Sequence, residues 1–162
     1  MKSMHHAVRL TLAALLAVAA FGAWAQVPSY GPSINLEQAK KVLVAAQAEA
    51  RKNSWPVAIA ILDTSGNLVA FEKMDDTQTA SVLVAQDKGK SAALYRRPTK
   101  VMEDAVAGGG AGVRFLNLRD ASTVEGGLPI TLGGKIIGAI GVSGVTSPQD
   151  GMIAKAGVEA LK

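Results

Sequence analysis

The 162-residue chain contains no cysteine, and its two histidines, His5 and His6, lie at the extreme N-terminus. Beyond residue 6 there is therefore neither a thiol nor an imidazole. Zinc sites of the common type and Cys–His or Ser–His–Asp catalysis need those groups, so the rest of the chain cannot form them. A disulfide framework is excluded as well.

Acidic residues are absent before Glu37, and this N-terminal region has the pattern of a signal peptide. Lys2 and Arg9 precede an apolar run over residues 10–21, which is shorter than the roughly 20 residues that span a bilayer. Residues 23–25 (Ala-Trp-Ala) then supply a small-x-small cleavage site. We therefore expect residues 1–25 to be removed, giving a periplasmic or secreted protein with no membrane anchor. The alternative is an uncleaved interfacial anchor.

Cleavage would leave 137 residues with a net charge of +2, because the leader holds two of the 17 basic residues and none of the 13 acidic ones. A nucleic-acid partner is not expected at so small a charge. Aromatic residues make up only 4% of the sequence, so the core must consist of Ala, Val, Ile and Leu. We expect an extended lead-in over residues 26–35 and one domain over residues 36–162.

The hydrophobic pattern predicts two β-hairpins separated by helices. An amphipathic helix follows the capping-box pair Asn35 and Gln38, and strands are expected at 57–62 and 68–73. A second helix is expected at 80–95, a helical turn at 99–106, and a second hairpin at 128–132 and 135–143. Ser147, Pro148 and Asp150 have the pattern of N-cap, N1 and N3 of a last helix. The order predicts an α+β fold in which helices pack on an antiparallel sheet.

Glycines are grouped in two places. Residues 108–112 (GGGAG) lack the Gly-Lys-Ser/Thr ending of a phosphate loop, so a flexible or subunit-contacting loop is expected there, followed by a segment at 113–118 that fits a short strand. Gly138, Gly141 and Gly144 weaken the last strand, which predicts that another backbone or a ligand approaches it closely.

Lys88 is the charged residue with the most informative position. At helical spacing it shares a face with Ser91 and Tyr95, and that face is otherwise apolar. A partly buried lysine can bind an anion or act as a base with a lowered pKa, whereas a snorkelling lysine is the structural alternative. Asp75, next to Asp76, is a second candidate catalytic residue. We expect this acidic pair to be solvated rather than to bind a metal.

Two adjacent glycines, Gly126 and Gly127, precede Pro129 at the entry to the second hairpin. Their unshielded backbone N–H groups could form an anion-binding nest. Beside Lys88 this turn would make a corner for a carboxylate, although the sequence does not say whether the two meet. The predicted ligand-binding residues are Lys88, Ser91, Tyr95, Gly126, Gly127 and Pro129.

Three stretches resemble the GlcG/HbpS-like, or haem-degrading, family. They are VAIAILDTSGNLVAFEKMD (57–75), AQDKGKSAALYRRPT (85–99) and GGLPITLGGKIIGAIGVSG (126–144) followed by Gln149-Asp150. The similarity runs from about residue 36 to residue 161. Lys73 stands where the family motif has arginine, and residues 88–91 (Lys-Gly-Lys-Ser) replace its Lys-Ala-x-Thr.

The resemblance implies a profilin-like fold with a five-stranded antiparallel sheet, a homo-oligomer, and a haem or corrinoid ligand. Because the expected mature chain has no histidine, an iron ligand would have to be a tyrosine or a methionine. The candidates are Tyr30, Tyr95, Met74, Met102 and Met152.

Three functions are consistent with these observations. The first is an exported small-molecule-binding protein with haem or another tetrapyrrole as ligand, in which Lys88 pairs with a propionate. The second is an enzyme or accessory protein for a small carboxylate or aromatic metabolite, with Lys88 binding the anion and Asp75 as base. The third is a structural or sensing oligomer.

Overall fold

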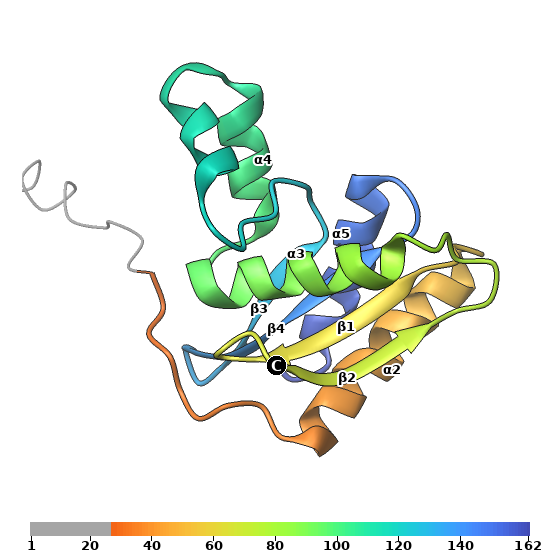
Figure 1. The fold of residues 1–162 in the computed structure, drawn as a ribbon. Helices are drawn as coiled ribbons and strands as arrows, with labels where there is room; N and C mark the ends of the chain where they lie inside the picture. Colours follow the sequence, from red (N-terminus) through yellow and green to blue (C-terminus); the bar gives the residue numbers. More distant parts are fainter. Residues whose placement is uncertain (1–26) are drawn as a thin grey trace, which may run out of the picture.

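The computed structural model describes residues 27–162, so the expected signal peptide lies outside the described part (Figure 1). No helix in residues 27–162 is long and apolar enough to cross a membrane. The elements in chain order are α2 (Leu36–Lys52), β1 (Ala58–Asp63), β2 (Leu68–Lys73), α3 (Ser81–Tyr95), α4 (Thr99–Ala107), the 3-10 helix η2 (Gly110–Asn117), β3 (Gly127–Leu132), β4 (Lys135–Ser143) and α5 (Ser147–Glu159).

The strands form one antiparallel sheet in the order β2-β1-β4-β3, which confirms the α+β class. Within the described residues the sheet has four strands, where five were expected. Residues 113–118 do not supply a strand, because they lie mostly in η2. Gly109 and Gly110, with φ of +68° and +54°, turn the chain back onto α4 instead of toward the sheet.

The lead-in runs along the first residues of β4, beyond the end of β1. Tyr30 forms an isolated parallel bridge with Ile136, and the amide of Ile34 donates to the carbonyl of Ile137 at 2.6 Å. Strand β1 pairs with β4 only from Gly138 onward. The lead-in therefore satisfies the backbone groups of β4 that β1 does not reach.

Helices α2 and α5 cover one face of the sheet (Figure 1). This face carries the main core. Along the central strands, large β-branched side chains that point to this face alternate with small residues that point to the other face. Its fully buried members include Val42, Ile59, Ile61, Ile140, Val142 and Ile153.

Helix α3 covers the opposite face, and there the packing is between backbones. A Cβ on Gly141 of β4 would overlap the carbonyl oxygen of Ala85, and a Cβ on Gly89 of α3 would lie 3.0 Å from the amide nitrogen of Gly141. Most other buried residues of this interface are alanines, and Leu62 is the large side chain among them. The alanines are Ala58, Ala60, Ala92, Ala93 and Ala139. The prediction that another backbone approaches the glycines of the last strand is confirmed.

The N-cap of α2 is the one predicted from the sequence, whereas the N-cap of α5 differs from the prediction. Asn35 and Gln38 form the expected reciprocal capping box of α2. For α5, the N-cap is Thr146, paired with Gln149, rather than Ser147 with Asp150. The capping box moves by one residue because the carboxylate of Asp150 faces inward, where it meets Lys88.

Candidate functional site

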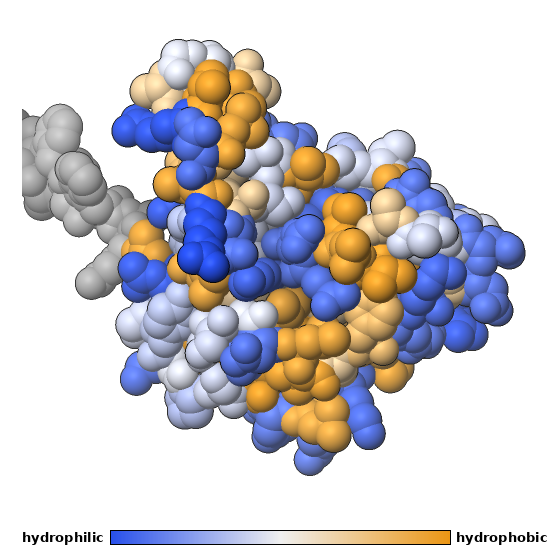
Figure 2. All heavy atoms as spheres, in the orientation of Figure 1, coloured by the Kyte–Doolittle hydropathy of each residue, from blue (hydrophilic) through white to orange (hydrophobic). Residues whose placement is uncertain are grey.

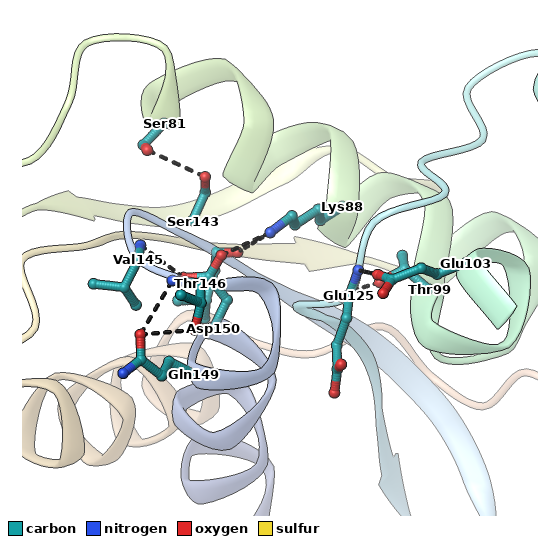
Figure 3. Close-up of polar contacts among 12 residues, drawn as sticks. Ser81, Lys88, Thr99, Glu103, Glu125, Ser143, Val145, Thr146, Gln149 and Asp150 are labelled. Atoms are coloured by element: carbon teal, nitrogen blue, oxygen red, sulfur yellow. Dashed lines mark hydrogen bonds and ion pairs between the residues drawn. The ribbon is translucent and has the colours of Figure 1, made fainter. Parts of the chain in front are cut away.

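Lys88 and Asp150 form a buried ion pair between α3 and the first turn of α5 (Figure 3). The Nζ atom of Lys88 lies 2.8 Å from Oδ2 of Asp150 and donates to the carbonyl of Val142 at 3.1 Å. Both side chains are 2% exposed. Lys88 is therefore enclosed rather than snorkelling, and its charge is balanced inside the protein.

The Gly126–Gly127 turn does meet Lys88, as a carboxylate-binding corner requires. A Cβ on Gly126 would lie 2.9 Å from Lys88 Nζ and 2.6 Å from the carbonyl oxygen of Val142. The amide of Gly127 donates to Oγ1 of Thr99 at 3.0 Å. The two glycines thus allow close packing, and an internal carboxylate, that of Asp150, takes the place that was predicted for a ligand.

Burial raises the pKa of Asp150, and the hydrogen bond and charge of Lys88 act in the opposite direction. Asp150 also accepts a hydrogen bond from the amide of Val145 at 3.3 Å. The pair links α3, the end of β4 and the start of α5. A ligand carboxylate at Lys88 would therefore compete with that of Asp150.

The other predicted ligand-binding residues also have partners within the protein. The hydroxyl of Ser91 is buried and donates to Sδ of Met102 at 3.7 Å. The hydroxyl of Tyr95 donates to the carbonyl of Arg119 at 2.6 Å. Pro129 lies in β3 opposite Ala139. Their role in binding a ligand stays a prediction.

The candidate iron ligands differ in accessibility. Tyr30 donates its hydroxyl to the carbonyl of Ala93 at 2.8 Å, and Met102 is fully buried. Met152 is 53% exposed on α5. Met74 lies at the surface hollow described next.

A surface hollow of about 400 Å³ lies at the end of β2, beside the last turn of α2. We call it the Met74 hollow; its lining residues are Arg51, Glu72, Lys73, Met74 and Asp75. It contains the Lys-Met-Asp motif and the candidate base Asp75, but not Lys88. The structure therefore places the two candidate catalytic residues in different sites.

Two cations in the Met74 hollow have no carboxylate partner within residues 27–162, namely Arg51 and Lys73. Glu72 accepts a hydrogen bond from the side-chain amide of Gln47. The hollow thus combines two cations without an ion pair in the described chain, the carboxylates of Glu72 and Asp75, and a thioether. Sequence reasoning missed Arg51, because only the fold brings the end of α2 beside the end of β2.

Near the Lys88 pair, Glu125 and Glu103 approach one another (Figure 3). A carboxylate oxygen of Glu103 accepts a hydrogen bond from the amide of Glu125. Burial and the charge of Glu103 raise the pKa of Glu125. Within residues 27–162, no three Asp or Glu side chains are grouped in a way that could hold a metal ion.

The family model for the haem-degrading, HbpS-like proteins matches residues 34–159. Protein GlcG of Escherichia coli (strain K12) is 40% identical over 110 residues, which cover 68% of this chain and 81% of GlcG. An uncharacterised 15.0 kDa protein of Citrobacter freundii, from the dhaT-dhaS intergenic region, is 35% identical over 131 residues. That match covers 80% of this chain and 92% of the relative.

Solved structures are similar over most of the chain. The crystal structure of HbpS superposes with a TM-score of 0.75 and 26% identity, covering 83% of this chain and 94% of HbpS. The crystal structure of a PduOC:haem complex superposes with a TM-score of 0.72 and 25% identity, covering 80% of this chain and 96% of that chain.

Proposed function

The chain belongs to the haem-degrading, HbpS-like family. We propose that it is an exported protein that binds a small molecule bearing carboxylates, with haem or another tetrapyrrole as the first candidate. The similarity to HbpS and to a haem-bound PduOC supports this class of ligand. The observation that carries the proposal is the pair of unpartnered cations beside a thioether in the Met74 hollow.

The residues of this hollow fit the polar parts of a haem. Arg51 and Lys73 can each pair with one of the two propionates, since Arg and Lys form charge-assisted hydrogen bonds to carboxylates. Met74 carries the thioether, which is an iron ligand in other haem proteins. Haem would supply a redox-active iron; the protein would bind and orient it through these three side chains. Among the candidate iron ligands, Met74 is the one that lines the same hollow as Arg51 and Lys73.

A haem titration of the purified protein tests the proposal. We expect a saturable Soret band, and we expect Arg51→Gln and Lys73→Gln each to weaken binding about tenfold, the effect of one charged hydrogen bond. Lys135→Gln is the matched control, because Lys135 is an exposed lysine at the start of β4 without an ion pair in the described chain. Equal losses in Lys73→Gln and Lys135→Gln would refute the role of the hollow.

The iron ligand has a separate test. Met74→Leu retains the size of the side chain and removes the sulfur, so we expect the Soret maximum to shift. Met152→Leu removes an exposed sulfur and should leave the spectrum unchanged. A spectrum that both variants leave unchanged would exclude Met74 as the iron ligand.

The polar lining of the Met74 hollow favours a second candidate, a small carboxylate on which the protein acts as an enzyme or accessory. Arg51 and Lys73 would bind the anion and Asp75 would be the base. Calorimetric titration with small mono- and dicarboxylates distinguishes the candidates. Binding of these acids, with no saturable haem band, would favour this function and argue against a tetrapyrrole.

Export, assembly and fold type complete the proposal. Export with cleavage after Ala25 is supported by the sequence pattern of residues 1–25, and the mass of protein recovered from the periplasm or medium tests it. A mature chain beginning at Gln26 is expected; uncleaved protein would contradict it.

We also propose homo-oligomeric assembly and a profilin-like topology. The topology is supported by an antiparallel sheet with helices on both faces.

A further inference from the structure

A second hollow, of about 410 Å³, lies between α3 and the segment at 118–126 that returns from η2 to β3. This volume falls in the range of small-molecule pockets. We call it the α3 hollow; it shares no lining residue with the Met74 hollow. On α3 it is lined by Val84, Asp87 and Lys90, whose three-residue spacing places them on one side of the helix. The return segment contributes Asp120, Ala121, Ser122 and Val124.

The return segment is held at both ends. Near its start, the hydroxyl of Tyr95 donates to the carbonyl of Arg119 at 2.6 Å. The next residue, Asp120, has φ of +58°, in the left-handed region that aspartate tolerates. Near its end, the amide of Glu125 donates to the carboxylate of Glu103. The segment is therefore fixed beside α3, and the hollow between them is preformed.

One wall of the α3 hollow is the ion pair of Lys90 and Asp120, whose Nζ and Oδ1 atoms lie 3.0 Å apart. The stem of Lys90 packs on the β1–β2 turn, since a Cβ on Gly66 would lie 2.9 Å from Cγ of Lys90. Arg119 also approaches Asp120, at 3.8 Å from Nε to Oδ2, but its side chain is 96% exposed and does not line the hollow. The charge of Asp120 is therefore balanced within the protein.

Asp87 carries the charge that is not balanced. Among residues 27–162 its carboxylate forms no ion pair. Lys90 lies three residues further along the helix, but its ammonium group is paired with Asp120. The charged side chains that line the hollow are thus Asp87 and Asp120 against Lys90, a net charge of −1. A hollow of this charge attracts cations and disfavours anions.

The rest of the lining is apolar apart from one hydroxyl group. Val84 and Ala121 are half-buried, Val124 is 42% exposed, and Ser122 supplies the hydroxyl. Figure 2 shows an apolar group over the first turns of α3, with polar side chains next to it along the helix. A single free carboxylate beside apolar walls matches a ligand that has one positive charge and a small apolar body.

We propose that the α3 hollow binds a small organic amine as its ammonium ion. The carboxylate of Asp87 accepts a charge-assisted hydrogen bond from the ammonium group, which has three N–H donors, and the hydroxyl of Ser122 accepts a second. The apolar part of the amine packs against Val84 and Val124. The Met74 hollow, with its two cations, selects an anion, so the two hollows bind ligands of opposite charge and neither site depends on the other.

Titration of the purified protein with phenethylamine, followed by NMR, tests the site. The comparison ligand is phenethyl alcohol, which has nearly the same size and no charge. We expect saturable shifts at the amides of Val84, Ala121 and Val124, and binding of the amine at least about tenfold tighter than that of the alcohol, the value of one charged hydrogen bond. Equal affinities, or no saturable shift at these amides, would overturn the proposal.

Asp87→Asn removes the charge at constant size, so we expect it to weaken amine binding about tenfold and to leave binding of the alcohol unchanged. Asp76→Asn is the matched control, because Asp76 is exposed in the loop before α3, has no ion pair in the described chain and does not line the hollow. Circular dichroism would confirm that both variants fold, and equal losses in the two would refute the role of Asp87.

Haem titration of Asp87→Asn separates this proposal from the function proposed above. The variant should bind haem as wild type does, and a loss of haem binding in it would contradict two independent sites. Amine binding by a wild-type protein that shows no haem band would support the amine site and refute only the tetrapyrrole.

Discussion

Replacing Lys88 by methionine is the most informative test of the packing between α3 and α5. The variant retains most of the side-chain length and removes the charge that faces Asp150. At 2.8 Å between Nζ and Oδ2, and with an effective dielectric constant of about 20, the attraction is about 6 kcal/mol. Desolvation of two buried charges offsets much of it, so the net value of the pair is far smaller.

The cost of the single variant is larger than that net value, because Asp150 is left buried without a cation. We expect Lys88→Met to lower the free energy of unfolding by about 3–5 kcal/mol. The double variant Lys88→Met/Asp150→Leu removes both charges at similar volume, and we expect it to lie within about 1 kcal/mol of wild type. Loss of the hydrogen bond from the amide of Val145 to Asp150 accounts for part of this remaining difference in the free energy of unfolding.

The pH dependence gives an independent check. Burial already raises the pKa of Asp150, and loss of Lys88 removes the interaction that opposes this shift. A raised pKa in the folded state means that stability is lost as pH rises through that pKa. Urea unfolding of Lys88→Met should therefore show stability that falls with rising pH. A single-variant cost below about 1 kcal/mol, or double-variant costs that simply add, would refute the reasoning.

Three further predictions concern other contacts. Gly141→Ala should cost about 3 kcal/mol or more, measured by urea unfolding, because its Cβ would overlap the carbonyl oxygen of Ala85; a cost below about 1 kcal/mol would contradict the backbone packing. Tyr30→Phe should cost about 1 kcal/mol, the value of the hydrogen bond from its hydroxyl to a carbonyl of α3, and no change would mean that the lead-in is not held there. For Glu125, burial and the charge of Glu103 raise the pKa, so wild type loses stability as pH rises through it. Glu125→Gln should remove this loss, and parallel stability curves of the two proteins between acidic and neutral pH would contradict it.

Local patterns were sufficient to predict most of the fold. The continuous apolar run at 57–62 indicated a strand covered on both faces, and β1 has that burial. Asn35 and Gln38 marked the start of α2 because a capping box is complete within four residues. Residues 113–118 fitted a short strand but lie mostly in η2, which packs on α4 through the backbone of Gly112, a close approach that periodicity does not report.

The site was harder to predict, because its contacts are long-range. The pattern correctly placed Lys88 on the buried side of its helix, but its partner Asp150 lies 62 residues later. Asp150 was placed at N3 of the last helix, behind Ser147 as N-cap, whereas Thr146 is the N-cap and Gln149 occupies N3. Arg51 and Lys73 are each unremarkable alone, and only the packing of α2 beside β2 brings them to one hollow.

The contact between α3 and β4 limits how this protein can change over evolution. Where helix and strand meet through Gly89 and Gly141, no side chain separates them, so any larger residue at either position would overlap the backbone of the other layer. New specificity is then expected at the end of β2, where Arg51, Lys73 and Asp75 line the Met74 hollow with exposed side chains. The spacing between α3 and the sheet then stays constant, while proteins descended from this sequence can change in ligand or partner.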